Sequence, residues 1–147
     1  MAFAIPTSGT PASKEARVAT LIRQSVTFKA VPHDVYEALM DSRKHAGFTG
    51  ERARISRQVG GAISAYSGCI TGTNVELVPN RKIVQIWHAS DWPEGHLSRV
   101  TFKLTPIKGG TRLAFTHRGV PERDVASIKQ GWIDNYWQPL KSMLQKA

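Results

Sequence analysis

His117 is the side chain of this 147-residue sequence that is best placed to do chemistry. Leu113, Phe115 and His117 alternate with polar residues, which is the period-two pattern of a half-buried strand, so the imidazole shares the apolar face. An imidazole in that position can orient a ligand, transfer a proton, or serve as a core histidine bonded to a neighbour. The residues alone leave all three interpretations open.

Two carboxylates and an imidazole lie within the short segment from Asp91 to His96, a density that suggests a metal site. Pro93 and Gly95 in the same segment are turn formers, and the sequence offers no second cluster of ligands. The segment is therefore interpreted as a turn between strands. Neither a metal nor another cofactor is expected.

Cys69 is the single cysteine, which excludes an internal disulfide and a cysteine-rich zinc site. No histidine stands at a fixed spacing from it, so a thiol nucleophile is not favoured. The pairs Gly60-Gly61 and Gly109-Gly110 lack the spacing and the following helix of a phosphate-binding loop. Nucleotide binding is therefore not expected.

The charge balance is strongly basic, with 20 Lys and Arg against 11 Asp and Glu and a formal net charge of +9. The surplus is scattered, and its densest patch, Arg52, Arg54 and Arg57, is interpreted as the exposed face of a strand. This favours a solvated basic face over a polyanion site, and no specific nucleic-acid partner is expected. The sequence begins without a secretory signal and lacks an apolar run of about 18 residues, which predicts a cytoplasmic protein without a transmembrane segment.

The elements that must position these side chains are mostly strands. Residues 1–18 are rich in turn formers and are predicted to be a flexible arm before one domain over 19–147. A short helix is predicted after Pro32. Period-two alternation and flanking turn residues predict strands over 22–28, 53–59, 63–66, 69–78, 82–90, 100–104 and 113–118.

After Pro121 the apolar period changes from two to about 3.6 residues, which predicts a long amphipathic helix over 122–146. Pro139 lies inside this span and is expected to kink it, because proline lacks a backbone donor. An antiparallel sheet with one apolar face needs a cover, and this helix is the only predicted element large enough. Its apolar stripe consists of Val125, Ile128, Trp132, Tyr136, Leu140, Met143 and Leu144.

Several short strings follow one another in an order that matches a known family. They are Phe28-Lys29-Ala30, Val35-Tyr36 with Ala38-Leu39 and Asp41, Val59-Gly60-Gly61, Val75 to Pro79, Lys82 to Gln85 with Trp87, Trp92 to His96, Gly119-Val120-Pro121 and Gly131-Trp132. Over about residues 21–147 the sequence thereby resembles the C-terminal domain of the activator of the heat-shock protein 90 ATPase. That family belongs to the START-like, helix-grip superfamily.

The resemblance implies an α+β helix-grip fold, in which a curved antiparallel sheet wraps around the long C-terminal helix. It also implies two short helices after the first strand. Relatives often carry a tryptophan in the loop where this chain has residues 45–48, so the resemblance implies that Phe48 replaces it.

In this fold, the space between sheet and helix binds small molecules when apolar walls surround a few polar groups. The leading hypothesis is therefore a non-catalytic domain that binds a small, mostly apolar or lipid-like ligand. A module that binds a heat-shock protein 90 homologue, and a cyclase- or hydrolase-like enzyme with His117 as general base, are the alternatives. The candidate ligand-binding residues, for which core packing is the competing interpretation, are Phe48, Tyr66, Trp87, Phe102, Phe115, His117, Trp132 and Tyr136.

Overall fold

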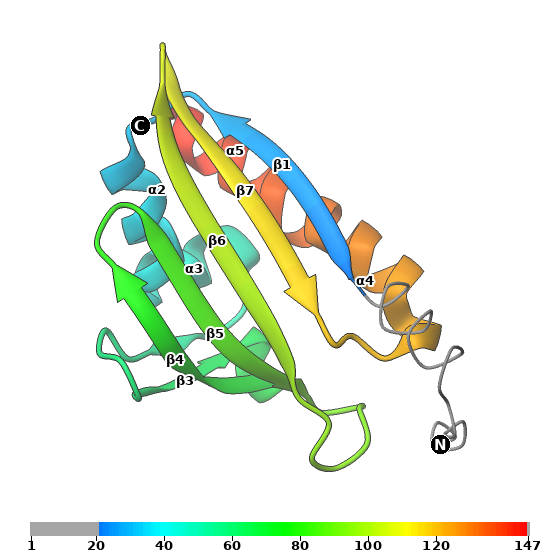
Figure 1. Ribbon diagram of the computed structural model, residues 1–147. Helices are drawn as coiled ribbons and strands as arrows, with labels where there is room; N and C mark the ends of the chain where they lie inside the picture. Colours follow the sequence, from blue (N-terminus) through cyan, green and yellow to red (C-terminus); the bar gives the residue numbers. More distant parts are fainter. Residues whose placement is uncertain (1–20, 147) are drawn as a thin grey trace.

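The computed structural model describes residues 21–146, and the arm predicted over 1–18 lies outside the described residues (Figure 1). The strands are β1 (Ile22–Phe28), β2 (Arg54–Ile55), β3 (Ala62–Ala65), β4 (Ile70–Val78), β5 (Lys82–Ala89), β6 (Ser98–Ile107) and β7 (Gly110–Arg118). The helices are α2 (Pro32–Met40), α3 (Ser42–Thr49), α4 (Val125–Trp132) and α5 (Gln138–Lys146). A π-helical segment, η4 (Ile133–Trp137), joins α4 to α5, and single 3₁₀ turns are η2 (Tyr66–Gly68) and η3 (Glu122–Asp124).

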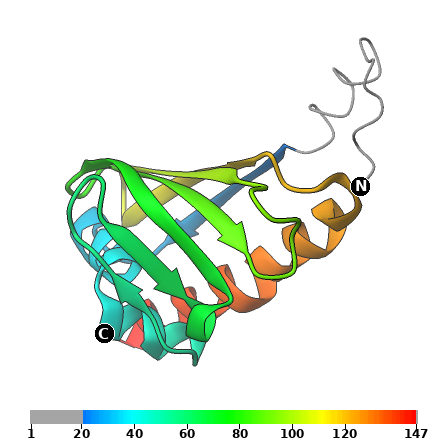
Figure 2. The ribbon, with the colours of Figure 1, turned by 90° about the horizontal axis from the view of Figure 1, so that it is seen from below.

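All strands belong to one antiparallel sheet in the order β1-β7-β6-β5-β4-β3-β2. The sheet curves around the helical segment from α4 to α5, which lies along its concave side (Figure 2). The register places Val100 opposite His117 and Phe102 opposite Phe115, so these side chains share the concave face. The predicted helix-grip fold is confirmed.

The two short helices after β1 are also confirmed, and each has a local cause. Pro32 starts α2 with a fixed φ at its first position. The Asp41 side chain accepts a hydrogen bond from the Lys44 backbone N–H at 2.9 Å and so caps α3. Gly50 ends α3 in the left-handed conformation with φ 77°. His45 and Phe48 therefore lie on a helix, and the expectation that they lie in a loop is wrong.

The strand predicted over 53–59 is much shorter than expected. Of this segment only Arg54–Ile55, strand β2, pairs with β3, and the chain then turns, with the Gly61 N–H donating to the Gln58 carbonyl at 3.0 Å. The left-handed φ of Gly60, 84°, fits this turn. Arg57 therefore lies beyond the strand, where it forms an ion pair with Glu37 at 2.6 Å rather than sharing a strand face with Arg54.

The C-terminal helix is confirmed in position but not in regularity. The expected disturbance at Pro139 takes the form of the π-helical segment immediately before it. Pro139 has no N–H for the Asn135 carbonyl four residues earlier. The Tyr66 hydroxyl, from the turn after β3, donates to that carbonyl at 3.2 Å. A side chain from the turn after β3 thus replaces the missing helical donor.

The core lies between the concave face of the sheet and this helix. Phe115 and Leu140 are fully buried there, and Trp132, Tyr136 and Trp137 are each at most 5% exposed. None of the described helices is long and apolar enough to cross a membrane.

Candidate functional site

An open groove runs between α4 and one end of the sheet, and its volume is about 520 Å³. One wall is formed by helical residues between Asp124 and Tyr136. The opposite wall comes from the turn around Tyr66 to Ile70, the end of β5 and the loop after it, and His117 lies at the end of β7. The groove is thus bounded by segments far apart in the sequence.

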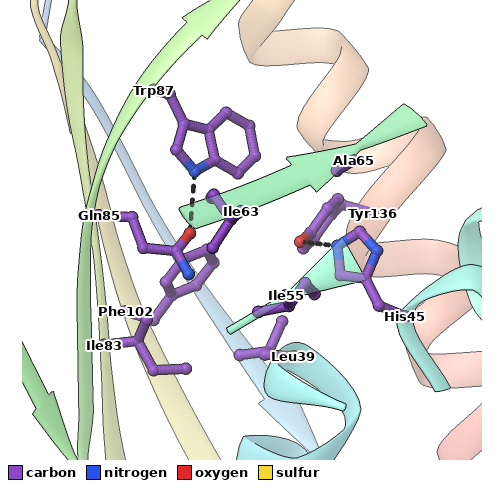
Figure 3. Close-up of a pocket in the computed structure, with 10 residues that line it drawn as sticks. All are labelled: Leu39, His45, Ile55, Ile63, Ala65, Ile83, Gln85, Trp87, Phe102 and Tyr136. Atoms are coloured by element: carbon purple, nitrogen blue, oxygen red, sulfur yellow. Dashed lines mark hydrogen bonds between the residues drawn. The ribbon is translucent and has the colours of Figure 1, made fainter. Parts of the chain in front are cut away.

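A second, enclosed cavity of about 10 Å³ lies deeper in the core (Figure 3). Its walls are mostly aliphatic and aromatic side chains of the sheet, with Leu39 from α2 and His45 from α3. Trp87 and Tyr136 line both the groove and this cavity, so their rings form the partition between the two. The interior behind that partition has room for about one water molecule.

His117 is a buried, fully bonded histidine. The Trp132 indole N–H donates to Nδ1 at 3.1 Å, and Nε2 lies 2.8 Å from the Ser98 hydroxyl oxygen. Because an indole is only a donor, Nδ1 must accept, and the neutral ring therefore carries its proton on Nε2 and donates to Ser98. Burial lowers the pKa of the ring to about 3. This geometry favours the core-histidine interpretation over a general base, since no ring nitrogen has a free lone pair.

His45 is the polar residue of the interior that the sequence reasoning missed. Its Nε2 lies 2.5 Å from the Tyr136 hydroxyl oxygen, whereas its Nδ1 is buried without a hydrogen-bond partner. Burial lowers the pKa of His45 to about 4 and raises the pKa of Tyr136 well above its ordinary value. The signal in the sequence is its spacing of three from Phe48, which places both on one face of α3.

A buried polar chain supports the partition from the sheet side. The Trp87 indole donates to Gln85 Oε1 at 2.9 Å, and the Gln85 amide donates to Asn74 Oδ1 at 3.0 Å. The Asn74 amide donates in turn to the carbonyls of Ser56 and Gln58. These bonds fix the orientation of Trp87 and of the turn after β2 together.

The eight predicted ligand-binding residues divide into three groups. Those that line the groove are Tyr66, Trp87, His117, Trp132 and Tyr136. Phe102 lines only the small core cavity, whereas Phe48 and Phe115 line neither. Phe48 packs against Tyr136 with a centroid distance of 5.1 Å, and Phe115 packs against Trp132 at 4.3 Å. Alternation along the strands and helical periodicity identified the inward faces. They did not show which inward side chains border the groove.

Several groove residues were not among the predicted set. Ile128 and Gly131 come from α4, and Trp92 follows β5 in the segment that was interpreted only as a turn. The segment does form the connection between β5 and β6, but Trp92 is 7% exposed and packs edge-on against His88. Within residues 21–146, no group of three or more His, Cys, Asp or Glu is arranged to hold a metal ion.

Comparison with known proteins shows to which family this chain is related. The family model for Activator of Hsp90 ATPase homolog 1-like protein matches residues 29–145. The chain belongs to this family. The human Activator of 90 kDa heat shock protein ATPase homolog 1 is 30% identical to it over 115 residues, which are 78% of this chain and 34% of the relative. The mouse homolog 2 is 33% identical over 98 residues, 67% of this chain and 30% of the relative.

This member of the Activator of Hsp90 ATPase homolog 1-like family thus spans about a third of the length of these curated relatives. Among solved structures, PFC0360w of Plasmodium falciparum, described as an HSP90 activator, has a TM-score of 0.79 at 27% identity, covering 86% of this chain and 96% of that chain. The Aha1 dimer of Colwellia psychrerythraea has a TM-score of 0.74 at 22% identity, covering 84% and 95%, and shares the fold.

Proposed function

We propose that this domain binds a small, largely apolar molecule in the open groove between α4 and the sheet. The groove itself is the observation that carries the proposal, because about 520 Å³ falls within the range of roughly 300–1,000 Å³ typical of ligand pockets. The core cavity of about 10 Å³ is too small for anything but a water molecule. A ligand would therefore bind on the solvent side of the partition.

The groove walls suit a flat apolar molecule. Trp87 and Trp132 are stacked with their centroids 5.2 Å apart and an interplanar angle of 28°, and each contributes a ring to the groove. Aromatic rings bury a large area and hold a ligand at low conformational cost, because hydrogen bonds already fix both indoles. The bound molecule needs no rearrangement of the core.

Gly131 allows the groove to be blocked without unfolding the domain. It lies in α4 on the groove wall, and a Cβ added there meets only the Asn135 side-chain nitrogen, at 3.7 Å. Gly131→Leu should therefore place an isobutyl group in the groove. It should also raise the free energy of unfolding by about 0.5–1 kcal/mol, because glycine is a poor helix former.

The matched control is Gly47→Leu in α3, where a Cβ meets nothing within 4 Å and the groove is not involved. We expect lipid-like and aromatic probes to shift the NMR resonances of the Trp87 and Trp132 indoles in the wild type and in the control. Gly131→Leu should abolish these shifts. Equal shifts in both variants, or no shift in any protein across the panel, would reject the proposal.

A second candidate function is binding to a heat-shock protein 90 homologue. Family membership favours it, and PFC0360w, which this fold covers almost completely, is described as an HSP90 activator. The outer face of the sheet also places Arg99 opposite Arg118, and Lys103 opposite Lys82, which forms an ion pair with Glu76. Like charges in directly opposite positions cost stability, so an acidic partner surface would offset the repulsion between Arg99 and Arg118.

The chaperone candidate is tested with the heat-shock protein 90 homologue of the same organism. Co-precipitation and ATPase stimulation should be weakened by Arg99→Gln combined with Lys103→Gln, and Gly131→Leu should leave both unchanged. Loss of stimulation in Gly131→Leu alone would locate the chaperone contact in the groove instead. If the wild-type domain neither binds nor stimulates the chaperone, this candidate is rejected.

A further inference from the structure

The charge of the groove is opposite to the charge of the protein. The chain has 20 Lys and Arg against 11 Asp and Glu, yet the groove is lined by Glu51, Asp91 and Asp124 and by no Lys or Arg. The two ion pairs found within residues 21–146 are Arg57 with Glu37 and Lys82 with Glu76, so neither neutralises a groove carboxylate. The charged side chains that line the groove are therefore all acidic.

Six basic side chains lie on the convex outer face of the sheet. At the outward positions of the four strands β1, β7, β6 and β5 there are six basic residues and no acidic one, namely Arg23, Arg112, Arg118, Arg99, Lys103 and Lys82. The groove is lined by residues of α4, which lies on the concave side of the sheet (Figure 2). The Debye length is about 8 Å at physiological ionic strength, so exposed charges farther than this from the groove are largely screened. A molecule in the groove responds mainly to the near carboxylates.

The walls of the groove add a second, independent preference for positive charge. Trp87, Trp92 and Trp132 all line it, and tryptophan is the aromatic side chain that attracts a cation most strongly over its ring face. Trp132 is stacked on Trp87 and on Trp137, so this attraction comes from Trp87 and Trp92. The one feature that favours an anion is the N-terminus of α4, which carries about half a positive charge. Asp124 lies at that terminus without a side-chain capping bond, so its carboxylate offsets this charge.

We infer that the groove selects an organic cation, namely an amine or quaternary ammonium group attached to a flat apolar body. This inference rests on the proposed ligand-binding function and adds the charge of the ligand to it. The apolar body packs against the parts of Trp87, Trp92 and Trp132 that line the groove, and the cationic group lies at the rim near the carboxylates. Fatty acids, acyl phosphates and other anionic amphiphiles are disfavoured, because the lining holds no Lys or Arg to pair with them and His117 is neutral.

The test uses three probes that share one apolar body and differ in charge. They are 2-naphthylmethylamine, 2-naphthalenemethanol and 2-naphthoate, which are cationic, neutral and anionic at pH 7. Dissociation constants are measured on the full chain by calorimetry and by NMR shifts of the groove indoles, at low salt and at 0.5 M NaCl. We expect the amine to bind roughly tenfold more tightly than the alcohol at low salt, with the naphthoate weakest. High salt should reduce the preference.

A charge-matched pair of variants locates the source of the preference. Glu51→Gln, Asp91→Asn and Asp124→Asn together remove the rim carboxylates and should reduce the preference for the amine to about twofold, leaving the affinity for the alcohol unchanged. The control, which changes the total charge equally, combines substitutions at carboxylates outside the groove lining: Asp34→Asn, Glu76→Gln and Asp134→Asn. It should retain the full preference.

The outcomes separate this inference from the function on which it rests. Equal binding of all three probes, or tighter binding of the naphthoate, overturns the inference and leaves the groove as a ligand site. An amine preference that persists in the rim variant, or disappears equally in the control, also overturns it. Absence of binding by every probe counts against the proposed function and the inference together.

Discussion

Lowering the pH from 7.5 to 5 should reduce the free energy of unfolding of this domain by about 4 kcal/mol. His45 and His117 are buried and neutral in the folded protein, where burial lowers their pKa values to about 4 and about 3 from the ordinary 6.5. At pH 5 both imidazoles are mostly protonated in the unfolded chain, whereas they stay mostly neutral in the folded protein. One proton costs about 1.4 kcal/mol per pH unit, so 1.5 units below 6.5 gives about 2 kcal/mol for each histidine.

The sign follows from the direction of the two pKa shifts. A folded-state pKa that lies below the unfolded value means that stability is complete above about pH 6.5 and is lost as the pH falls towards 4. The loss of stability becomes less steep only where the two histidines of the folded protein also bind protons. Because domains are usually stable by about 5–15 kcal/mol, the predicted loss at pH 5 is a large part of the total.

The assay is urea unfolding at pH 7.5, 6.5, 5.5 and 5, followed by the fluorescence of the four tryptophans. His117→Gln and His45→Gln keep hydrogen-bonding groups but do not titrate, so each should remove about half of the pH dependence. His33→Gln, at an exposed position of α2, is the matched control. A wild-type change below about 1 kcal/mol between pH 7.5 and 5, or an undiminished slope in the double glutamine variant, would refute the reasoning.

Two further predictions concern backbone features. Tyr66→Phe should lower the free energy of unfolding by about 0.5–1.5 kcal/mol, because the Asn135 carbonyl loses the Tyr66 hydroxyl as a donor. The loss should be smaller in a Pro139→Ala background, which restores a helical N–H. Equal losses in both backgrounds, measured by urea unfolding, would contradict this explanation. Gly72→Ala should destabilise the domain by about 1–3 kcal/mol, because the new Cβ collides with the Ile86 backbone carbonyl of the paired strand; an unchanged melting temperature would show that the strands separate freely there.

Much of the fold could be predicted because the apolar residues of this sequence recur with the periods of strands and helices. The alternation along 113–118 and the three-to-four spacing from Val125 to Leu144 follow directly from which face is buried. The strand predicted over 53–59 ends at Ile55, because Arg57 interrupts the apolar alternation of Ala53, Ile55 and Val59, and Gly60 and Gly61 follow in a turn. Alternation without apolar residues on one face does not specify a strand.

The candidate site was only partly predictable, because a cavity is defined by space that side chains leave empty. Strand alternation correctly placed Trp87 inward and helical periodicity placed Trp132 inward, but whether an inward ring fills the core or borders the groove depends on the curvature of the sheet. His45 was missed because its partner, Tyr136, stands 91 residues away. The negative rim was hidden for the same reason, since Glu51, Asp91 and Asp124 meet only in three dimensions.

The π-helical segment between α4 and α5 explains how the apolar stripe stays aligned over the whole C-terminal helix. Trp132, Tyr136, Leu140 and Leu144 recur every four residues and are all buried, whereas a regular α-helix repeats every 3.6 residues and would turn each step about 40° further from the sheet. The wider turn at Ile133–Trp137 absorbs part of that rotation. The extra residue in the π-helical turn therefore keeps the apolar stripe facing the sheet. Deleting one residue there would make the helix locally regular and rotate everything after it by about 100°, which would carry Leu140 and Leu144 away from the sheet.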